Sequence, residues 1–157
     1  MGKLLSKDDL VLPPIDDGIA PTIQRFKLDG NHLMKMYKAF LKYDTDFSGW
    51  INQEEFHRLI KDHANLFFFS TQLFQMLNLK PKASSKKYEL DFNDFIYVVS
   101  SFCMFGRSEL LQLLFNCYDP DKTGLIGESS VSQNRAFNFV MNNEHGASIY
   151  IHIYLFA

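Results

Sequence analysis

The twelve residues from Asp44 to Glu55 constrain this chain more than any other segment, because they carry oxygen atoms at a fixed spacing. Side-chain oxygens stand at positions 1, 3, 5, 9 and 12 of the segment, and Gly49 stands at position 6. A hard cation such as Ca²⁺ takes six to eight oxygen ligands in a flexible cage, and a glycine permits the sharp bend that folds the chain around the ion. The spacing therefore predicts a calcium loop.

Each expected ligand of this loop has its own role. The ligands are the side chains of Asp44, Asp46, Ser48 and Asn52, the backbone carbonyl of Trp50, and both carboxylate oxygens of Glu55. Ile51, at position 8, is expected to form the short β-segment that pairs neighbouring loops. Because helical patterns flank it, the segment matches an EF-hand loop, and its three acidic ligands predict a dissociation constant of roughly 10⁻⁷ to 10⁻⁵ M. The alternative interpretation is an acidic surface turn between two helices.

The remaining pattern predicts an all-α fold, in which an EF-hand helix–loop–helix pair forms a calmodulin-like lobe beside an incomplete second lobe. Residues 1–29 are expected to form an N-terminal arm without a helix, because Pro13, Pro14 and Pro21 break helices. The other expected stretches are the EF-hand pair at 30–106, a third, incomplete EF-hand at 107–131, and an atypical tail at 132–157.

The second loop, residues 83–94, is predicted to be structural and degenerate. Its positions 1, 3 and 5 hold Ala83, Ser85 and Lys87. A lysine at a ligand position repels a cation, and no acid stands at these three positions to attract one. Leu90, at position 8, can still pair with Ile51 of the first loop.

The third loop, residues 119–130, begins as a calcium loop and then departs from the pattern. Asp119, Asp121 and Thr123 occupy positions 1, 3 and 5, and the carbonyl of Leu125 falls at position 7. Position 9 is a glycine, and position 12 is a serine where a bidentate Glu is expected. The loss of these oxygens predicts weak calcium binding, and the alternative is a degenerate loop held by packing.

Composition argues against several other classes of protein. A net charge of −2 and a pI near 6.2 disfavour a nucleic-acid binder. We find no nucleophile elbow, phosphate loop or zinc-ligand spacing, so the protein is predicted not to be an enzyme. Cys103 and Cys117 lie among apolar residues and predict buried free thiols. No apolar run approaches the ~20 residues that a membrane span needs.

Two further runs carry a family resemblance. They are Leu-Asp-Phe-Asn-Asp-Phe-Ile at 90–96 and Leu-Phe-Asn-Cys-Tyr-Asp-Pro-Asp at 114–121. With the spacing of the loops, they make residues 30–128 resemble the calcineurin B and neuronal calcium sensor superfamily. The resemblance implies four EF-hands in two lobes, calcium sensing, and a helical target peptide held in a hydrophobic groove. This chain departs from that pattern because a fourth EF-hand is absent and its best loop comes first.

The two ends of the chain suggest further properties. Gly2, followed by a serine at position 6, fits the pattern for N-myristoylation, and the start of the chain resembles that of neuronal calcium sensors. One acyl chain predicts weak, reversible membrane contact, on the order of 10⁴ M⁻¹, for a cytoplasmic protein at the inner face of a membrane. The alternative is an ordinary disordered N-terminus. Residues 132–157 fit either a native family end or a truncated or alternative product.

These features predict a calcium-binding regulatory protein that binds an amphipathic helix of a phosphatase, kinase or membrane protein in response to calcium. The alternative is a non-sensing EF-hand scaffold or subunit with one structural ion. The residues expected to line the groove are Met36, Phe40, Phe56, Ile60, Phe74, Leu77, Phe95 and Val99. For each of them the alternative is a purely structural place in the core. The identity of the partner and the oligomeric state lie beyond the sequence.

Overall fold

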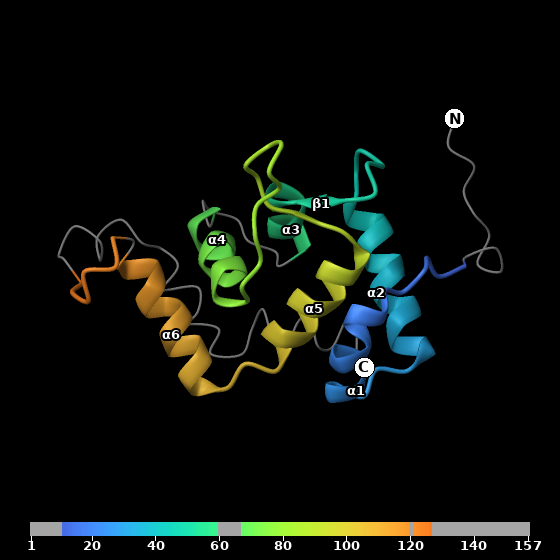
Figure 1. The fold of residues 1–157 in the computed structure, drawn as a ribbon, viewed down its shortest axis with the longest axis horizontal. Helices are drawn as coiled ribbons and strands as arrows, with labels where there is room; N and C mark the ends of the chain where they lie inside the picture. The colour runs from blue at the N-terminus through green and yellow to red at the C-terminus, as the bar shows by residue number, and fades with distance from the viewer. Residues whose placement is uncertain (1–10, 60–66, 120, 127–157) are drawn as a thin grey trace.

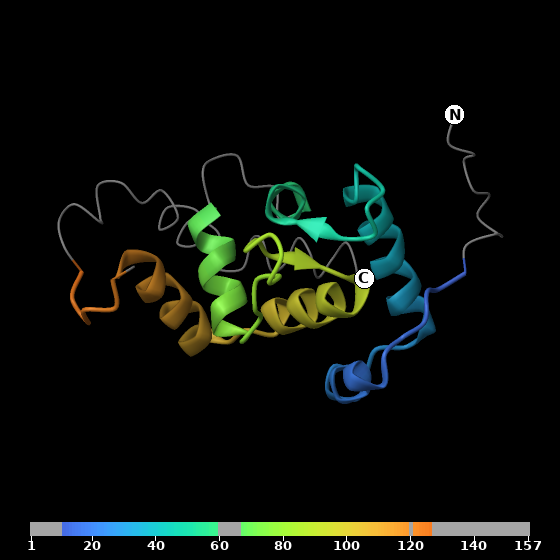
Figure 2. The same cartoon turned by 45° about the horizontal axis from the view of Figure 1, so that its top comes forward.

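The computed structural model describes residues 11–59, 67–119 and 121–126. This part of the chain consists of helices joined by loops, with one short two-stranded sheet (Figure 1). Figures 1 and 2 show α1 and α2 at one end of the described part, α4 and α6 at the other, and α5 between them. The all-α EF-hand prediction is confirmed by this architecture.

The first helix–loop–helix unit comprises α2 (Gly30–Tyr43), β1 (Ile51–Asn52) and α3 (Gln53–Leu59). Asp29 caps α2, because its carboxylate accepts a hydrogen bond from the His32 amide at 2.9 Å. The His32 ring accepts one in return from the Asp29 amide at 3.2 Å. This reciprocal capping satisfies backbone donors that have no partner within the helix, and it fixes where α2 begins.

The second unit comprises α4 (Phe67–Met76), β2 (Glu89–Leu90) and α5 (Phe92–Cys103). Strands β1 and β2 pair antiparallel, with Ile51 opposite Leu90 and Asn52 opposite Glu89. Ile51 and Leu90 are buried, so the pairing joins the two loops through an apolar contact as well as through backbone hydrogen bonds. The predicted pairing of Ile51 with Leu90 is therefore confirmed.

The helix of the third unit is α6 (Arg107–Tyr118), which packs against α4. It buries Leu113, Leu114 and Cys117 on the side toward the protein. Leu111 and Phe115 remain 52% and 37% exposed, so α6 keeps apolar surface on its other side. Residues 121–126 continue from this helix, and residues 127–157 lie outside the described part.

The N-terminal arm contains helices, which corrects the prediction from its prolines. A 3₁₀ helix, η1 (Asp17–Ile19), leads directly into α1 (Ala20–Arg25). Pro21 lies in the first turn of α1, where its missing N–H has no helical partner to lose, so a proline is tolerated there. Ile19 and Leu28 are buried in the core, and the arm therefore packs onto the EF-hand pair.

The core is dominated by phenylalanine. Phe40 contacts both Phe92 and Phe95 edge to face, with ring centroids 5.5 Å apart in each pair. Phe56 of α3 contacts Phe74 of α4 in the same way at 5.1 Å. Apart from Ile60, which lies outside the described residues, the side chains expected to line a groove are all buried here: Met36, Phe40, Phe56, Phe74, Leu77, Phe95 and Val99. In this structure they are core residues.

Candidate metal centre

Asp44 organises the start of the candidate calcium loop. It stands at the C-terminal end of α2 and is only 4% exposed. Its two carboxylate oxygens accept hydrogen bonds from the amides of Ser48 and Gly49, each at 2.9 Å. These bonds bend the loop back over the end of the helix, so the oxygens of the loop face one another.

Two residues in the bend adopt left-handed backbone conformations. Phe47 has φ of 55° and Gly49 has φ of 80°. A side chain at Gly49 would meet nothing within 4 Å, so the requirement for glycine there comes from the backbone conformation and not from crowding. The glycine at position 6 thus has the role that the sequence pattern predicts.

Glu55 closes the loop from the other side. It lies in the first turn of α3 and is 2% exposed. One carboxylate oxygen accepts hydrogen bonds from the Thr45 amide at 2.8 Å and the Thr45 hydroxyl at 2.7 Å. The other accepts one from the Asn52 amide at 3.1 Å, and the Asn52 side chain accepts one from the Glu55 amide at 3.1 Å. These hydrogen bonds orient the carboxylate into the loop.

The acidic side chains of the loop converge. Ligand atoms of Asp44, Asp46 and Glu55 all lie within 4.8 Å of one another. Hydrogen bonds from the Ser48 side chain and amide hold the pKa of Asp46 below its usual range, so this carboxylate is charged at neutral pH. Three carboxylates this close form a concentrated negative site, and their oxygens are the ligands that hard cations prefer.

The neutral ligands of the prediction lie in the same loop. The Ser48 hydroxyl donates a hydrogen bond to the Trp50 carbonyl at 3.0 Å, which places these two oxygens side by side. Asn52 is half-buried, and its side-chain oxygen accepts a hydrogen bond from the Glu55 amide in the first turn of α3. The residues present therefore fit a calcium ion in both chemistry and spacing.

Sequence reasoning overlooked Thr45. It stands at position 2, to which the ligand pattern assigns no role, yet its amide and hydroxyl hold the Glu55 carboxylate. The Arg58 guanidinium donates a further hydrogen bond to the Thr45 hydroxyl at 3.3 Å. A hydroxyl at position 2 is compatible with many surface loops, so the sequence offers no signal that singles it out.

The described part of the third loop repeats the geometry of the first. Asp119 is 6% exposed, and its oxygens accept hydrogen bonds from the Thr123 amide at 2.9 Å and the Gly124 amide at 2.7 Å. Desolvation acts to raise the pKa of Asp119, but these hydrogen bonds outweigh it and hold the pKa below its usual range. The Thr123 hydroxyl donates to the Leu125 carbonyl at 3.3 Å, and Asp121 is exposed.

Positions 9 to 12 of the third loop lie outside the described residues. The structure thus shows how this loop begins, whereas its ability to hold calcium remains a prediction from the sequence. Gly2 and the tail at 132–157 also lie outside the described residues.

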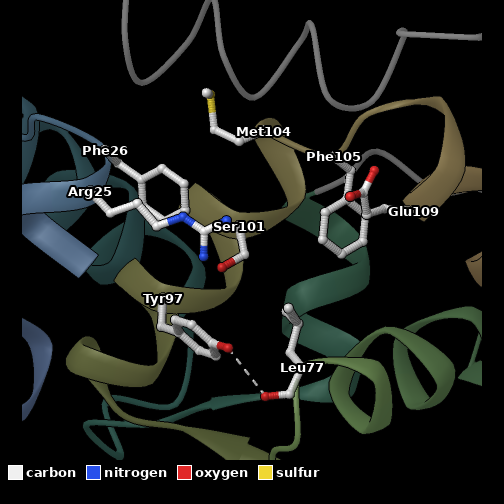
Figure 3. Close-up of a pocket in the computed structure, with 8 residues that line it drawn as sticks. All are labelled: Arg25, Phe26, Leu77, Tyr97, Ser101, Met104, Phe105 and Glu109. Carbon is white, nitrogen blue, oxygen red and sulfur yellow. Dashed lines mark hydrogen bonds between the residues drawn. The ribbon is translucent and has the colours of Figure 1, made fainter. Parts of the chain in front are cut away.

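A separate pocket of about 120 Å³ lies where α1, α5 and the link to α6 meet (Figure 3). Its lining comprises Arg25, Phe26, Leu77, Tyr97, Ser101, Met104, Phe105 and Glu109. Arg25 and Glu109 flank it from opposite sides, and the Tyr97 hydroxyl donates a hydrogen bond to the Leu77 carbonyl at 3.4 Å (Figure 3). The pocket shares no residue with the candidate calcium loop.

Among the described residues, no single helix has the length and apolar composition of a membrane span. Helices α5 and α6 satisfy that test only when taken together, and they are bent by 109° relative to one another.

Comparison with known proteins finds a similarity to the calcineurin B protein of Candida glabrata, which is named as a subunit. The two are 29% identical over 104 residues, which cover 66% of this chain and 55% of that protein. This chain thus spans about half the length of the curated relative that it matches. No protein-family model matches the chain.

The prediction of a non-enzymatic protein agrees with this relative. The similarity and the acidic cluster together point to the EF-hand calcium-binding proteins.

Proposed function

We propose that this protein is a calcium-binding regulatory protein that holds one Ca²⁺ at residues 44–55. The observation that carries the proposal is the convergence of Asp44, Asp46 and Glu55 within 4.8 Å. The similarity to calcineurin B supports a calcium-binding regulatory role. When bound, the ion supplies positive charge that offsets the mutual repulsion of these carboxylates.

Glu55 links the loop to the core. In this structure its carboxylate is engaged with Thr45 and Asn52. Coordination of an ion by both of its oxygens competes with these hydrogen bonds, and any shift of Glu55 moves the start of α3. The next residue, Phe56, contacts Phe74 of α4. A change at the loop is therefore transmitted to the contact between α3 and α4.

Movement at that contact is the proposed route to partner binding. The side chains first expected to line a groove are buried, so they become available to an amphipathic helix only when α3 and α4 separate. The partner is a protein, in keeping with the relative's name as a subunit, and a phosphatase, a kinase or a membrane protein would fit this mode of binding. The alternative is a scaffold whose single ion is structural.

Calcium titration by calorimetry tests the proposal and distinguishes a calcium sensor from a scaffold whose single ion is structural. A sensor binds with a dissociation constant of roughly 10⁻⁷ to 10⁻⁵ M, whereas a permanently filled site binds at about 10⁻⁸ M or tighter. Asp46→Asn removes an exposed carboxylate and should weaken binding by about tenfold or more without affecting the core. Asp17→Asn makes the same charge change on the exposed arm and should leave binding unchanged. A wild-type protein that neither releases nor absorbs heat of binding with calcium at millimolar concentration would refute the proposal.

N-myristoylation of Gly2, with weak contact at the inner face of a membrane, is a second part of the proposal. It rests on the sequence at the start of the chain. Gly2→Ala should move the protein from the membrane fraction to the soluble fraction of cells that express it. Mass spectrometry of the native protein that finds a free or acetylated N-terminus would contradict it.

A further inference from the structure

Lys82 joins the second loop to the candidate calcium loop. Its ammonium lies 3.0 Å from the centroid of the Trp50 ring. The same ammonium forms an ion pair with Glu89 at 2.8 Å, and the two side chains of the pair are 30% and 28% exposed. A cation over the face of a tryptophan is attracted by the ring quadrupole, and partial burial strengthens the attraction. Lys82 thus bridges an acidic residue of one loop and an aromatic residue of the other.

Two backbone hydrogen bonds fix the position of the Lys82 main chain, from which the side chain extends. Its amide donates a hydrogen bond to the Lys87 carbonyl at 2.9 Å, and its carbonyl accepts one from the Lys86 amide at 2.8 Å. Lys86 has φ of 55°, which matches Phe47 at position 4 of the first loop, with φ of 55°. The second loop therefore shares the left-handed residue at position 4 with the first loop, but not the one at position 6, where Tyr88 stands.

Two acids of the second loop, Glu89 and Asp94, interact with this lysine. Glu89 pairs with it directly. Burial and the neighbouring Asp91 raise the pKa of Asp94, and the charge of Lys82 acts in the opposite direction. The Lys82 ammonium thus interacts with Glu89 and Asp94 of the second loop and also with the Trp50 ring.

We propose that Lys82 is a positioning residue for the first loop: a cation immediately before the second loop that contacts the Trp50 ring and so keeps the Trp50 carbonyl in place for calcium. The inference rests on the proposed function. Trp50 immediately precedes β1, and Glu89 lies in β2 opposite Asn52. The contact between Lys82 and Trp50 therefore acts next to the backbone pairing that already joins the two loops.

Two effects of Lys82 on calcium binding oppose each other. Its positive charge repels a second cation, whereas its contact with Trp50 limits the conformations of the loop before binding. The ion pair with Glu89 leaves the two side chains without net charge in the wild type, whereas loss of the ammonium alone leaves Glu89 negative. Lys87→Met removes the same charge from an exposed position of the second loop, so it measures the effect of charge alone. A cation–π contact at a partly exposed site corresponds to a change of about two- to fivefold in an equilibrium constant. Removal of the ammonium should therefore weaken calcium binding by about that factor relative to Lys87→Met.

The test uses Lys82→Met, which keeps the length of the side chain without its charge, and Lys82→Arg, which keeps the cation. Lys87→Met is the matched control, because it removes the same charge from an exposed position in the second loop. The first readout is quenching of Trp50 fluorescence by acrylamide in calcium-free protein. Lys82→Met should increase quenching, while Lys82→Arg and Lys87→Met should stay close to the wild type.

The second readout is the calcium dissociation constant from calorimetry. Lys82→Met should bind calcium about two- to fivefold more weakly than Lys87→Met, and Lys82→Arg should bind it as the wild type does. In a Trp50→Leu background, Lys82→Met should bind calcium no more weakly than Lys87→Met, because Lys82 positions the loop through the ring. Equal calcium affinities for wild type, Lys82→Met and Lys87→Met would overturn the inference. Failure of calcium to bind the wild type would instead overturn the proposed function, and the quenching readout would still report on the contact between Lys82 and Trp50.

Discussion

Glu55→Gln tests the link between the loop and its ion most directly. In the calcium-free protein two effects of this change oppose each other. The glutamine carbonyl can still accept the hydrogen bonds from Thr45, but its NH₂ group meets the Asn52 amide, so one hydrogen bond to a charged acceptor is lost. Such a loss lowers the free energy of unfolding by about 1.5–3 kcal/mol.

The opposing effect is relief of repulsion among the carboxylates. At the 4.8 Å limit of their separation, Glu55 repels the buried Asp44 by about 1 kcal/mol with water-like screening, and Asp46 adds to this repulsion. The net loss of stability without calcium should therefore be at most about 2 kcal/mol. With calcium, the wild type gains RT ln(1 + [Ca²⁺]/Kd), which is about 4 kcal/mol at a thousandfold excess over Kd. The Glu55→Gln protein should gain almost none of this.

Thermal unfolding without calcium measures the loss of stability, and unfolding with calcium at about 1,000 times Kd measures the stability gained from the ion. For a chain of this size, about 4 kcal/mol corresponds to a rise in Tm of about 8–16 °C. Glu54→Gln is the matched control, since it removes the same charge from the neighbouring exposed position of α3 and should keep the full rise. If Glu55→Gln gained as much stability from calcium as Glu54→Gln, Glu55 would not be the closing ligand of the loop.

Other predictions follow from the backbone and from the thiols. Gly49→Ala, at φ of 80°, should lower the free energy of unfolding by about 1–2 kcal/mol in urea titrations. Gly30→Ala, which also meets nothing within 4 Å but begins α2, should raise it by about 0.4–1 kcal/mol; equal effects would contradict the backbone explanation. Burial raises the pKa of Cys103 and of Cys117 from 9.0 to about 12, so both should react with iodoacetamide about a thousandfold more slowly in the native protein than in urea. Because these pKa values are higher in the folded state, stability should fall as pH rises from about 9 to 12, and a Cys117→Ala variant should lose less of it over that range.

The candidate calcium loop could be located from the sequence because its ligands are close together in the chain. Spacing alone determines which oxygens share the inside of a loop of this length, and Gly49 marks the bend. The pairing of Ile51 with Leu90 was predictable for the same reason, since each is at position 8 of its loop. In these cases the interactions that decide the structure are local, or they repeat a local pattern.

Tertiary structure decided the features that depend on what the chain packs against. Pro21 suggested an arm without a helix, yet its place in a first turn and the burial of Ile19 allow one. Helical spacing could not distinguish a groove from a core, because both need apolar residues on one face. Lys82 lies outside the loop whose tryptophan it contacts, and the folded position of the second loop brings its ammonium to within 3.0 Å of the Trp50 ring. Contacts between segments distant in the chain leave no periodicity in the sequence, so they appear only when the fold places the two side chains together.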